Sequence, residues 1–402
     1  MDEKKKEVLN QFRVVFEQVG YDISANEYDR LKIDKPSRHK LKAFDLSWAE
    51  MKSLVIPEVP SSDPTYQALI SQNKALTERI AKEKDLTRAF VDNCLASIGK
   101  RSFKPAKVPK KEKVKENQQA HALRSDAHVG EYLDPDWVQG LNRYDADTYK
   151  KRVERWTEKM ILFREQDKAS LGLNKLILHL LGDQVTGENI FKGQRFYLDL
   201  HLTDQLFYSL EVETNQILAL AEVYPEIEIF CVLGNHGRPG MKGENHHKTN
   251  FDYIFYRSLQ KALEPQKNIK VFVSESPSMI AQHGNFVFLL NHGDNTRGWN
   301  GIPFYGLERT FRRLPGLYNM VINYELTAHF HQPCNLSDKV LMNGSLVGGD
   351  DLSINRMGLT NLPSQKLFYF DIIHGINRES NLYLADPVQL KPDSNGIFTA
   401  YK

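Results

Sequence analysis

The chain has few cysteines and no long apolar segment. Three cysteines occur among its 402 residues, Cys94, Cys231 and Cys334, and no two of them form a C-x-x-C pair. This usage excludes a zinc ribbon and a disulfide framework, and it indicates reduced thiols. No apolar run approaches the ~20 residues of a membrane-spanning helix. The opening MDEKKKEVLNQF is charged and lacks an apolar signal core. We therefore expect a cytoplasmic protein with no membrane partner.

The chain also has little net charge, because 53 Lys and Arg residues nearly balance 51 Asp and Glu residues. Positive charge is nevertheless concentrated in an expected linker, residues 100–117, which begins KRSFKPAKVPKKEKVK. Two interpretations stay open. The linker is either a solvated tether or an extended strand whose lysines neutralise DNA phosphates, each contact adding a salt-dependent increment. The DNA contacts would include Lys104, Lys110 and Lys111.

Residues 1–57 are predicted to form a small helical module. The stretch LSWAEMKSLVI predicts its last helix, with Ser47 as the N-cap and Glu50 at the capping-box position. Trp48 and Leu54 are expected to face inward.

Several short helices with a tight turn suggest a helix-turn-helix, and this stretch loosely resembles homeodomain-like modules. The outer face of its basic helix would carry Arg38, Lys40 and Lys42 toward DNA. The alternative is a docking domain with a solvated basic helix.

A long helix is predicted over residues 63–99, beginning at Asp63-Pro64. Leu69, Asn73 and Leu76 fit a heptad pattern, which would allow a short coiled coil and a homo-oligomer. The alternative is that one amphipathic face packs on the main domain.

Residues 118–402 are predicted to form a layered α/β domain. Apolar strands such as KLILHLLGD and IEIFCVLGNH alternate with helices expected at 145–169, 198–223 and 249–263. Polar residues follow the strands, and the carboxyl ends of strands in open α/β sheets form ligand sites. These residues are Asp126, His128, Asp183, Asn235, His236, His292, His329 and His331.

This ordered set, D-x-H, G-D, G-N-H, H and x-H-x-H, resembles the calcineurin-like metallophosphoesterase superfamily over roughly residues 118–350. The resemblance implies a β-sandwich flanked by helices. The 57-residue spacing between Asp126 and Asp183 looks more like the DNA-repair nucleases of that superfamily. The segment QQAHALRS before Asp126 is less apolar than the usual opening strand, which leaves its burial open.

The resemblance also implies two divalent metal ions. One would be held by Asp126, His128, Asp183 and His331, and the other by Asp183, Asn235, His292 and His329. Mixed imidazole and oxygen ligands suit Mn, Fe, Zn or Co, and we expect Mn. A bridging hydroxide would attack in line, while His236 protonates or stabilises the leaving oxygen.

Other polar residues have weaker assignments. Arg238 could touch a phosphate, and the segment GWNGIPFYGLERTFRRLPG should border the cleft, where arginines could hold substrate. These arginines are Arg309, Arg312 and Arg313. His179 is expected to be a core residue, and His283 is expected to lie in a turn. Neither is predicted to bind metal.

The site predicts hydrolysis of a phosphoester, and the N-terminal segments favour DNA as the substrate. The sequence is therefore interpreted as a metal-dependent DNA nuclease. One alternative is a small-molecule phosphodiesterase or phosphatase. The other is a DNA-binding assembly or repair factor with a vestigial metal site.

Overall fold

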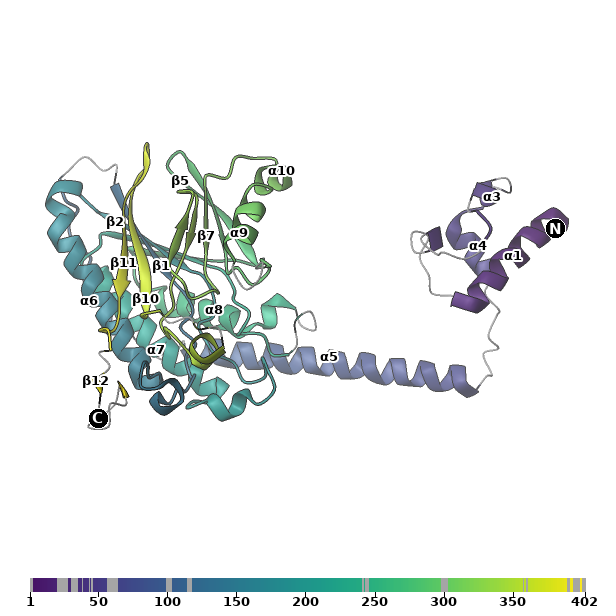
Figure 1. Cartoon of the computed structure of the whole chain (residues 1–402), viewed down its shortest axis with the longest axis horizontal. Helices are drawn as coiled ribbons and strands as arrows, with labels where there is room; N and C mark the ends of the chain where they lie inside the picture. Colours follow the sequence, from purple (N-terminus) through teal and green to yellow (C-terminus); the bar gives the residue numbers. More distant parts are fainter. Residues whose placement is uncertain are drawn as a thin grey trace. The chain divides into compact units, whose positions relative to one another are not determined.

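The computed structural model describes two compact units, Met1–Leu86 and Thr87–Lys402 (Figure 1). The described residues are 3–19, 28–29, 35–37, 39–42, 44, 46–55, 64–98, 103–113, 118–240, 242, 246–297, 303–356, 358, 361–388, 391–392 and 398–399.

The first unit contains α1 (Glu3–Val19), α3 (His39–Lys42) and α4 (Trp48–Val55). Its core is built from residues on all three helices and from Tyr28, which packs against Phe12, Phe16 and Trp48. Aromatic rings supply much of the buried area, which a module this small requires.

The capping box that the sequence predicts at α4 is confirmed. The backbone N–H of Ser47 donates to the Glu50 carboxylate at 2.9 Å, and the backbone N–H of Glu50 donates to Ser47 Oγ at 3.2 Å. The prediction that Leu54 faces inward is wrong, because this side chain is 45% exposed. Met51 and Val55, one helical turn apart, are buried in its place.

The basic helix of the predicted helix-turn-helix is α3, which has four residues. Arg38 and the side chains of Lys40 and Lys42 lie outside the described residues. Their contacts with DNA therefore stay a prediction.

The long helix is α5 (Pro64–Ile98), within one residue of the predicted bounds at each end. Leu69 and Leu76 are each about half exposed on it. Near its C-terminal end, Phe90 meets Phe251 edge-on at 6.3 Å between ring centroids, and Val91 packs on the main core. The C-terminal end of α5 therefore belongs to the core of the second unit, whereas dimerisation through the heptads stays a prediction.

Two β-sheets form the centre of the second unit. The first has six strands in the order β11-β10-β1-β2-β3-β4, in which β1 to β4 run parallel and β10 pairs antiparallel with β1. Its strands are β1 (Gln118–Arg124), β2 (Lys175–Leu180), β3 (Glu226–Cys231), β4 (Ile269–Val273), β10 (Ser364–Asp371) and β11 (Gly375–Tyr383).

The second sheet has five strands in the order β5-β6-β7-β9-β8. They are β5 (Ser278–His283), β6 (Phe286–Asn291), β7 (Tyr324–Thr327), β8 (Cys334–Leu336) and β9 (Val340–Met342). A separate short pair is formed by β12 (Lys391–Pro392) and β13 (Phe398–Thr399).

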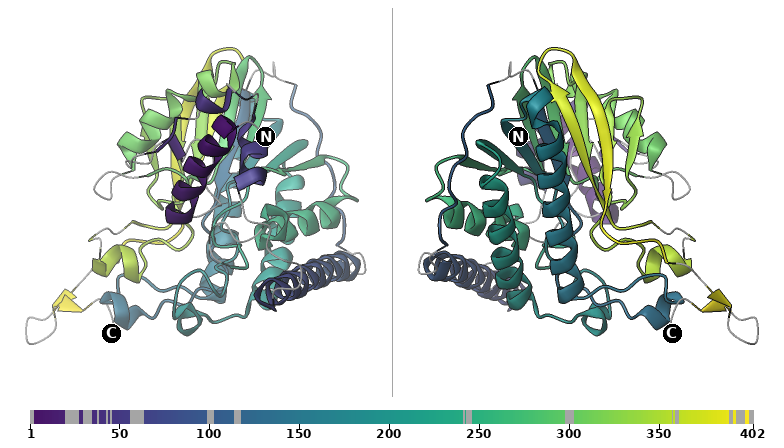
Figure 2. Two further views of the ribbon diagram at one scale, coloured as in Figure 1. Left: turned by 90° about the vertical axis from the view of Figure 1, so that its right-hand side faces the viewer. Right: turned by 90° about the vertical axis from the view of Figure 1, so that its left-hand side faces the viewer.

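Helices cover the first sheet on the side away from the second sheet (Figures 1 and 2). They are α6 (Ala146–Leu171), α7 (Leu202–Ala221) and α8 (Phe251–Leu263), close to the ranges that the sequence predicts. Shorter elements are η1 (Pro135–Val138), η2 (Gln194–Tyr197), η3 (His247–Thr249), α9 (Phe304–Phe311), α10 (Leu314–Tyr318) and the π-helix η4 (Leu352–Arg356). The layered α/β sandwich flanked by helices is confirmed.

Strand alternation gives each sheet residue its layer. On β1, Ala120 and Ala122 contact the helices, whereas Leu123 joins Phe288 and Phe368 between the two sheets. The last five residues of β1 are buried. This strand is therefore a core strand despite its modest apolar content.

The basic segment crosses the surface of the second unit in extended form and is held there at two points. The backbone N–H of Ala106 donates to Gln266 Oε1 at 2.9 Å, and that of Glu112 donates to Asn174 Oδ1 at 2.7 Å. The side chains of Lys104, Lys110 and Lys111 are exposed. Residues 103–113 are thus a docked strap, which we call the basic strap.

The described residues include no helix that is both long and apolar enough to cross a bilayer.

Candidate metal centre

The predicted ligands have an unusual backbone conformation. Ten non-glycine residues of the described chain have positive φ, and five of them are predicted metal ligands. These five are Asp126 (51°), His128 (42°), Asp183 (56°), His329 (72°) and His331 (57°). Such angles cost roughly 1–3 kcal/mol each and persist mainly at functional sites, where surrounding structure enforces them. The backbone of these loops therefore accepts strain at the residues whose side chains form the site.

The first and last predicted motifs meet in one cluster. His128 Nε2 lies 3.2 Å from His331 Nε2, and His331 Nε2 lies 3.4 Å from Asp126 Oδ1. Asp126 and His128 are buried, and His331 is partly buried. Ser125 Oγ donates to Asp126 Oδ2 at 2.6 Å and leaves Oδ1 directed at the histidines.

The second cluster follows β2, β3, β6 and β7. His292 Nε2 lies 3.0 Å from Asp183 Oδ2 and 3.1 Å from Asn235 Oδ1. The ring of His329 meets that of His292 at 5.1 Å between centroids. The Leu181 carbonyl can only accept a hydrogen bond, so His292 Nδ1, 2.7 Å away, carries a hydrogen. This bond leaves His292 Nε2 as the ring atom that faces the oxygens.

Asp183 belongs to both clusters. On one side, a carboxylate oxygen of Asp183 lies within 4.8 Å of a ring nitrogen of His292 and of one of His329. On the other side, its Oδ2 is 3.8 Å from His128 Nε2. A carboxylate between two groups of ligands is the arrangement that two nearby cations need, because its charge offsets their repulsion.

The charges of the site favour a cation. Burial alone would lower the pKa of His292, but the charge and hydrogen bond of Asp183 raise it to about 10. Burial is likewise outweighed at His331, where Asp126 raises the pKa to about 9. Despite its burial, Asp183 has a pKa well below its usual value because His292 and His236 are close. The two carboxylates therefore attract positive charge into a buried space.

The donor set fits divalent metal ions. Asp126 Oδ1 and His128 Nδ1 are buried and have no hydrogen-bond partner among the described residues. Imidazole nitrogens and carboxylate or amide oxygens, without thiolate, are ligands for Mn, Fe, Zn or Co. All seven predicted ligands lie in these two neighbouring clusters, with Asn235 placed through His292.

His236, the predicted catalytic residue, stands beside the shared carboxylate. Its backbone N–H donates to Asp183 Oδ1 at 2.7 Å, and its ring meets that of His128 at 4.4 Å. Its Nδ1 lies 3.0 Å from the carbonyl oxygen of Thr186, which can only accept, so Nδ1 carries a hydrogen. This bond fixes the ring and leaves Nε2 for another group.

Two glycines allow the loops after β2 and β3 to touch. A Cβ on Gly234 would lie 2.1 Å from Asp183 Oδ1, and one on Gly182 would lie 2.3 Å from the backbone nitrogen of Gly234. Gly182 also has a φ of 90°. Any side chain at either position would move the Asp183 carboxylate.

Asp252, near the start of α8, holds this contact together, and the sequence analysis did not identify it. Its carboxylate accepts backbone N–H bonds from Asp183 (2.8 Å), Gln184 (3.0 Å) and Gly234 (2.9 Å). The neighbouring Asn250 donates from Nδ2 to the Gly234 carbonyl oxygen at 2.9 Å. One helix start therefore ties both metal-motif loops together.

We expect Asp252→Asn to reduce metal affinity and hydrolysis by about 10–100-fold, the usual cost of losing a residue that orients ligands. The amide retains only one acceptor oxygen for three N–H donors. Inductively coupled plasma mass spectrometry and assay of the same preparation would measure both effects. Asp147→Asn, an exposed aspartate in the first turn of α6, is the matched control. Equal loss in both variants would contradict the role of Asp252.

Glu131 is a second residue that the motifs did not reveal. Its Oε2 lies 3.8 Å from His128 Nδ1, the ring nitrogen that faces away from His331. Burial and the nearby Asp350 raise the pKa of Glu131 to about 8. Glu131 is thus placed to orient the His128 ring.

The predicted substrate arginines have different positions. Arg238 lines a pocket of about 220 Å³ together with Asn235, Lys242, His246 and His247. This pocket adjoins the second cluster. The other three are Arg309, which lies in α9, and Arg312 and Arg313, which follow it. All three are exposed, and none has a described contact with a predicted metal ligand. Arg312 pairs with Glu308 at 3.2 Å.

No protein-family model and no curated protein matches the chain. Several solved structures are similar. Vps29 from Entamoeba histolytica complexed with Zn²⁺ has 12% identity and a TM-score of 0.26, over 66% of this chain and 99% of that one. Chaetomium thermophilum Vps29 has 10% identity and a TM-score of 0.25, over 70% and 92%. A dimetal phosphatase from Danio rerio has 10% identity and a TM-score of 0.33, over 66% and 99%. Similarity at this level assigns no activity.

Proposed function

We propose that this chain is a calcineurin-like metallophosphoesterase that hydrolyses phosphodiester bonds, with DNA as its substrate. The observation that carries the proposal is that two His/Asp clusters share one carboxylate, Asp183. Several of their residues lie in loops whose backbone has strained, positive φ angles. Packing alone does not require buried carboxylates and imidazoles at the ends of neighbouring strands.

Two divalent ions bound in these clusters would polarise phosphoryl oxygens and lower the pKa of a bound water molecule to near neutrality. The protein's own contribution is to fix the ligands before the substrate arrives. The Leu181 carbonyl orients His292, Glu131 faces His128, and Asp252 holds the Asp183 loop. Such preorganisation avoids reorganisation cost during the reaction.

His236 is assigned to the leaving oxygen. With Nδ1 held by Thr186, its Nε2 donates a proton when the ring is an imidazolium and accepts a hydrogen bond when the ring is neutral. Arg238 stands in the adjoining pocket, where a guanidinium can bind a non-reacting phosphate oxygen.

The basic strap supports DNA as the substrate. It exposes five lysines along one extended segment: Lys104, Lys107, Lys110, Lys111 and Lys113. Its attachment points, Asn174 and Gln266, precede β2 and β4, whereas the candidate centre follows the carboxyl ends of the strands. A six-residue strand is about 20 Å long. DNA bound by the strap would therefore be anchored at a distance from the bond that is cleaved.

A small phosphodiester is the second candidate, and a different observation favours it. The pocket beside Asn235 is small and lined by Arg238 and Lys242 together with two histidines. These side chains could enclose one or two phosphate groups without contacting a long polymer.

The two candidates are separated by removing charge from the strap. We expect a triple Gln variant of Lys104, Lys107 and Lys110 to hydrolyse bis-p-nitrophenyl phosphate at the wild-type rate with Mn²⁺. Its DNA binding should weaken, and the slope of log affinity against log salt should fall by up to about 3. The control is a triple Gln variant of the exposed Lys150, Lys151 and Lys192.

Unchanged DNA cleavage and salt slope in the strap variant would remove the strap from the proposal. Hydrolysis of the small ester without any DNA cleavage would favour the small-molecule candidate. Hydrolysis of neither substrate by a metal-loaded wild-type chain would contradict the phosphoesterase assignment.

A further inference from the structure

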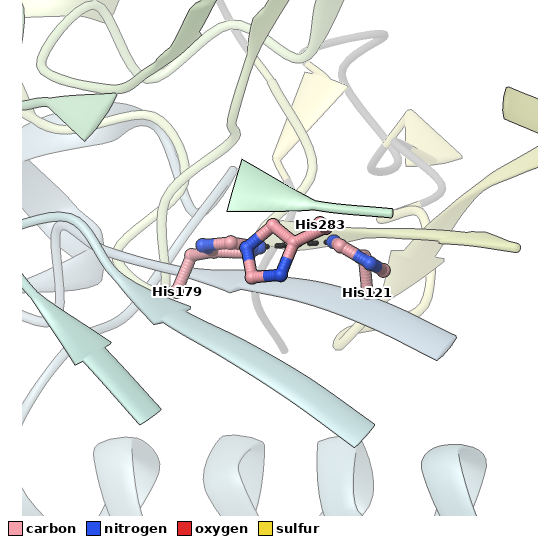
Figure 3. Close-up of side chains that lie close together, drawn as sticks. All are labelled: His121, His179 and His283. Atoms are coloured by element: carbon pink, nitrogen blue, oxygen red, sulfur yellow. Dashed lines mark hydrogen bonds between the residues drawn. The ribbon is translucent and has the colours of Figure 1, made fainter. Parts of the chain in front are cut away.

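Three histidines meet between the two sheets, away from the candidate metal centre (Figure 3). His121 is on β1, His179 is on the adjacent β2, and His283 is the last residue of β5 in the second sheet. His121 and His179 precede Asp126 and Asp183 by five and four residues, which is about 13–17 Å along a strand. The trio is therefore a separate cluster.

The three rings are close enough to share one ligand. One nitrogen from each ring lies within 4.8 Å of one nitrogen of each of the others. His121 Nδ1 and His179 Nε2 are 3.1 Å apart. Two nitrogens bound tetrahedrally to one Zn²⁺ at about 2.0–2.1 Å are separated by roughly 3.3–3.4 Å. The His283 ring completes a triangle with the other two, with its centroid 5.0 Å from that of His121 and 5.8 Å from that of His179 (Figure 3).

The hydrogen bonds of this cluster are incomplete. Its rings carry six nitrogens, and the side-chain bonds described join His121 to His179 and to Gln119 Oε1, at 3.3 Å. His179 Nδ1 and His283 Nε2 are buried without a partner among the described residues. A buried polar atom without a partner costs about 1–3 kcal/mol. The cluster therefore has the capacity to bind a ligand that accepts nitrogen electron pairs.

The surroundings are largely aromatic and keep the rings neutral. Phe368 and Phe288 stack on the His121 ring at 4.9 and 5.6 Å, and Phe230 stacks on His179 at 5.9 Å. Burial lowers the pKa of His121 and His179 well below the usual value, and that of His283 to about 4. Neutral imidazole is the form that binds metal.

The positive charge of Lys175, which acts on this cluster, is partly offset by two glutamates. Lys175, which contributes to the low pKa of His121 and His283, is paired with Glu226 at 3.0 Å and with Glu228 at 2.9 Å. His283 is 4% exposed, and it precedes a turn at Gly284.

We propose that His121, His179 and His283 form a mononuclear site for a transition-metal ion of the Zn²⁺ type, independent of the dinuclear centre. Three imidazole nitrogens suit Zn²⁺, Cu²⁺ or Ni²⁺ and do not suit Ca²⁺ or Mg²⁺, which require oxygen ligands. Because two ligands belong to one sheet and the third to the other, the ion ties the sandwich together. It stabilises the folded chain in proportion to its affinity.

The test counts zinc in the full-length chain after chelation, reloading with Zn²⁺ and removal of excess ion. His283→Gln should bind one zinc fewer per chain than wild type and hydrolyse bis-p-nitrophenyl phosphate normally. His331→Gln should lose hydrolysis. Adding His283→Gln to this variant should still lower its zinc content by one ion per chain. His201→Gln, in which the replaced side chain is 91% exposed, is the matched control.

Equal zinc content in wild type and a folded His283→Gln variant would overturn the proposal. The trio would then be a hydrogen-bonded histidine pair packed against a third ring. Should the variant fail to fold, the wild-type count decides: three zinc ions per chain support the site, and two or fewer overturn it.

Discussion

Asp183→Asn should reduce hydrolysis of bis-p-nitrophenyl phosphate by about 10³-fold or more and lower the number of bound metal ions. The substitution keeps the size of the side chain and removes the charge that both clusters share. Losing a single preorganised donor already costs about 10²–10³-fold in other enzymes. A carboxylate that serves two cations should cost at least as much, because both cations lose a ligand and their repulsion is no longer offset.

The measurement is a steady-state assay over a range of Mn²⁺ concentrations, with metal content determined on the same samples. Asp204→Asn, an exposed aspartate in the first turn of α7, is the control and should retain activity and metal. Full activity of Asp183→Asn at saturating Mn²⁺ would show that Asp183 is not the shared ligand. The fold would then need another explanation for its strained loops.

Most of the candidate ligands could be predicted because they follow apolar strands. Asp183 and Asn235 come after runs that form buried parallel strands, and parallel strands end at one edge of a sheet. Asp252 could not be found in this way. It acts through backbone N–H groups of a loop 69 residues away in sequence, and such a bond leaves no spacing pattern.

The fold shows the same division. Strands β2 and β3 and the helices α6, α7 and α8 follow from apolar periodicity, and they are present. The sequence analysis did not predict β10 and β11, although β10 is entirely buried beside β1. The segment SQKLFYFD contains Gln365 and Lys366, whose side chains are buried and hydrogen-bonded. Because these polar residues interrupt the apolar pattern, the segment does not look like a buried strand in the sequence. Only the tertiary partners make that strand a core strand.

His179 illustrates a limit of a different kind. Its expected position in the core is confirmed, since it is fully buried on β2. His283 was expected in a turn and instead ends β5, facing His179 with ring centroids 5.8 Å apart. The two residues are 104 positions apart in sequence. Only the pairing of the two sheets brings them together.

A buried ion pair connects the stability of the fold to the candidate centre. Arg124, the last residue of β1, donates to Glu213 of α7 at 2.5 Å, and its guanidinium lies 4.5 Å from the Trp156 ring. Tyr149 also donates to Glu213, at 2.8 Å. Gln184, which follows the shared carboxylate, donates to Tyr149 Oη at 3.2 Å. This network therefore links β1, α6 and α7 to the metal-motif loop.

Removing Glu213 should be strongly destabilising. In Glu213→Ala the guanidinium of Arg124 would remain in the core without its anion. Nε and Nη1 of this arginine already have no hydrogen-bond partner within the described part of the chain. Breaking one side of a buried pair typically costs about 3–5 kcal/mol. We expect that loss in urea unfolding followed by near-ultraviolet circular dichroism. Glu211→Ala, at an exposed position on the same helix, should change stability by no more than about 0.5 kcal/mol.

The loss of stability in Glu213→Ala has two candidate causes, the unpaired charge and the lost packing, and a double variant separates them. If the unpaired charge is responsible, Arg124→Met combined with Glu213→Leu should be more stable than Glu213→Ala, because apolar pairs of similar volume often replace buried ion pairs without penalty. A double variant as unstable as the single one would indicate that volume and the tyrosine hydrogen bond matter more than charge. In either case hydrolysis should fall along with stability, because Gln184 would lose the network that holds it beside Asp183.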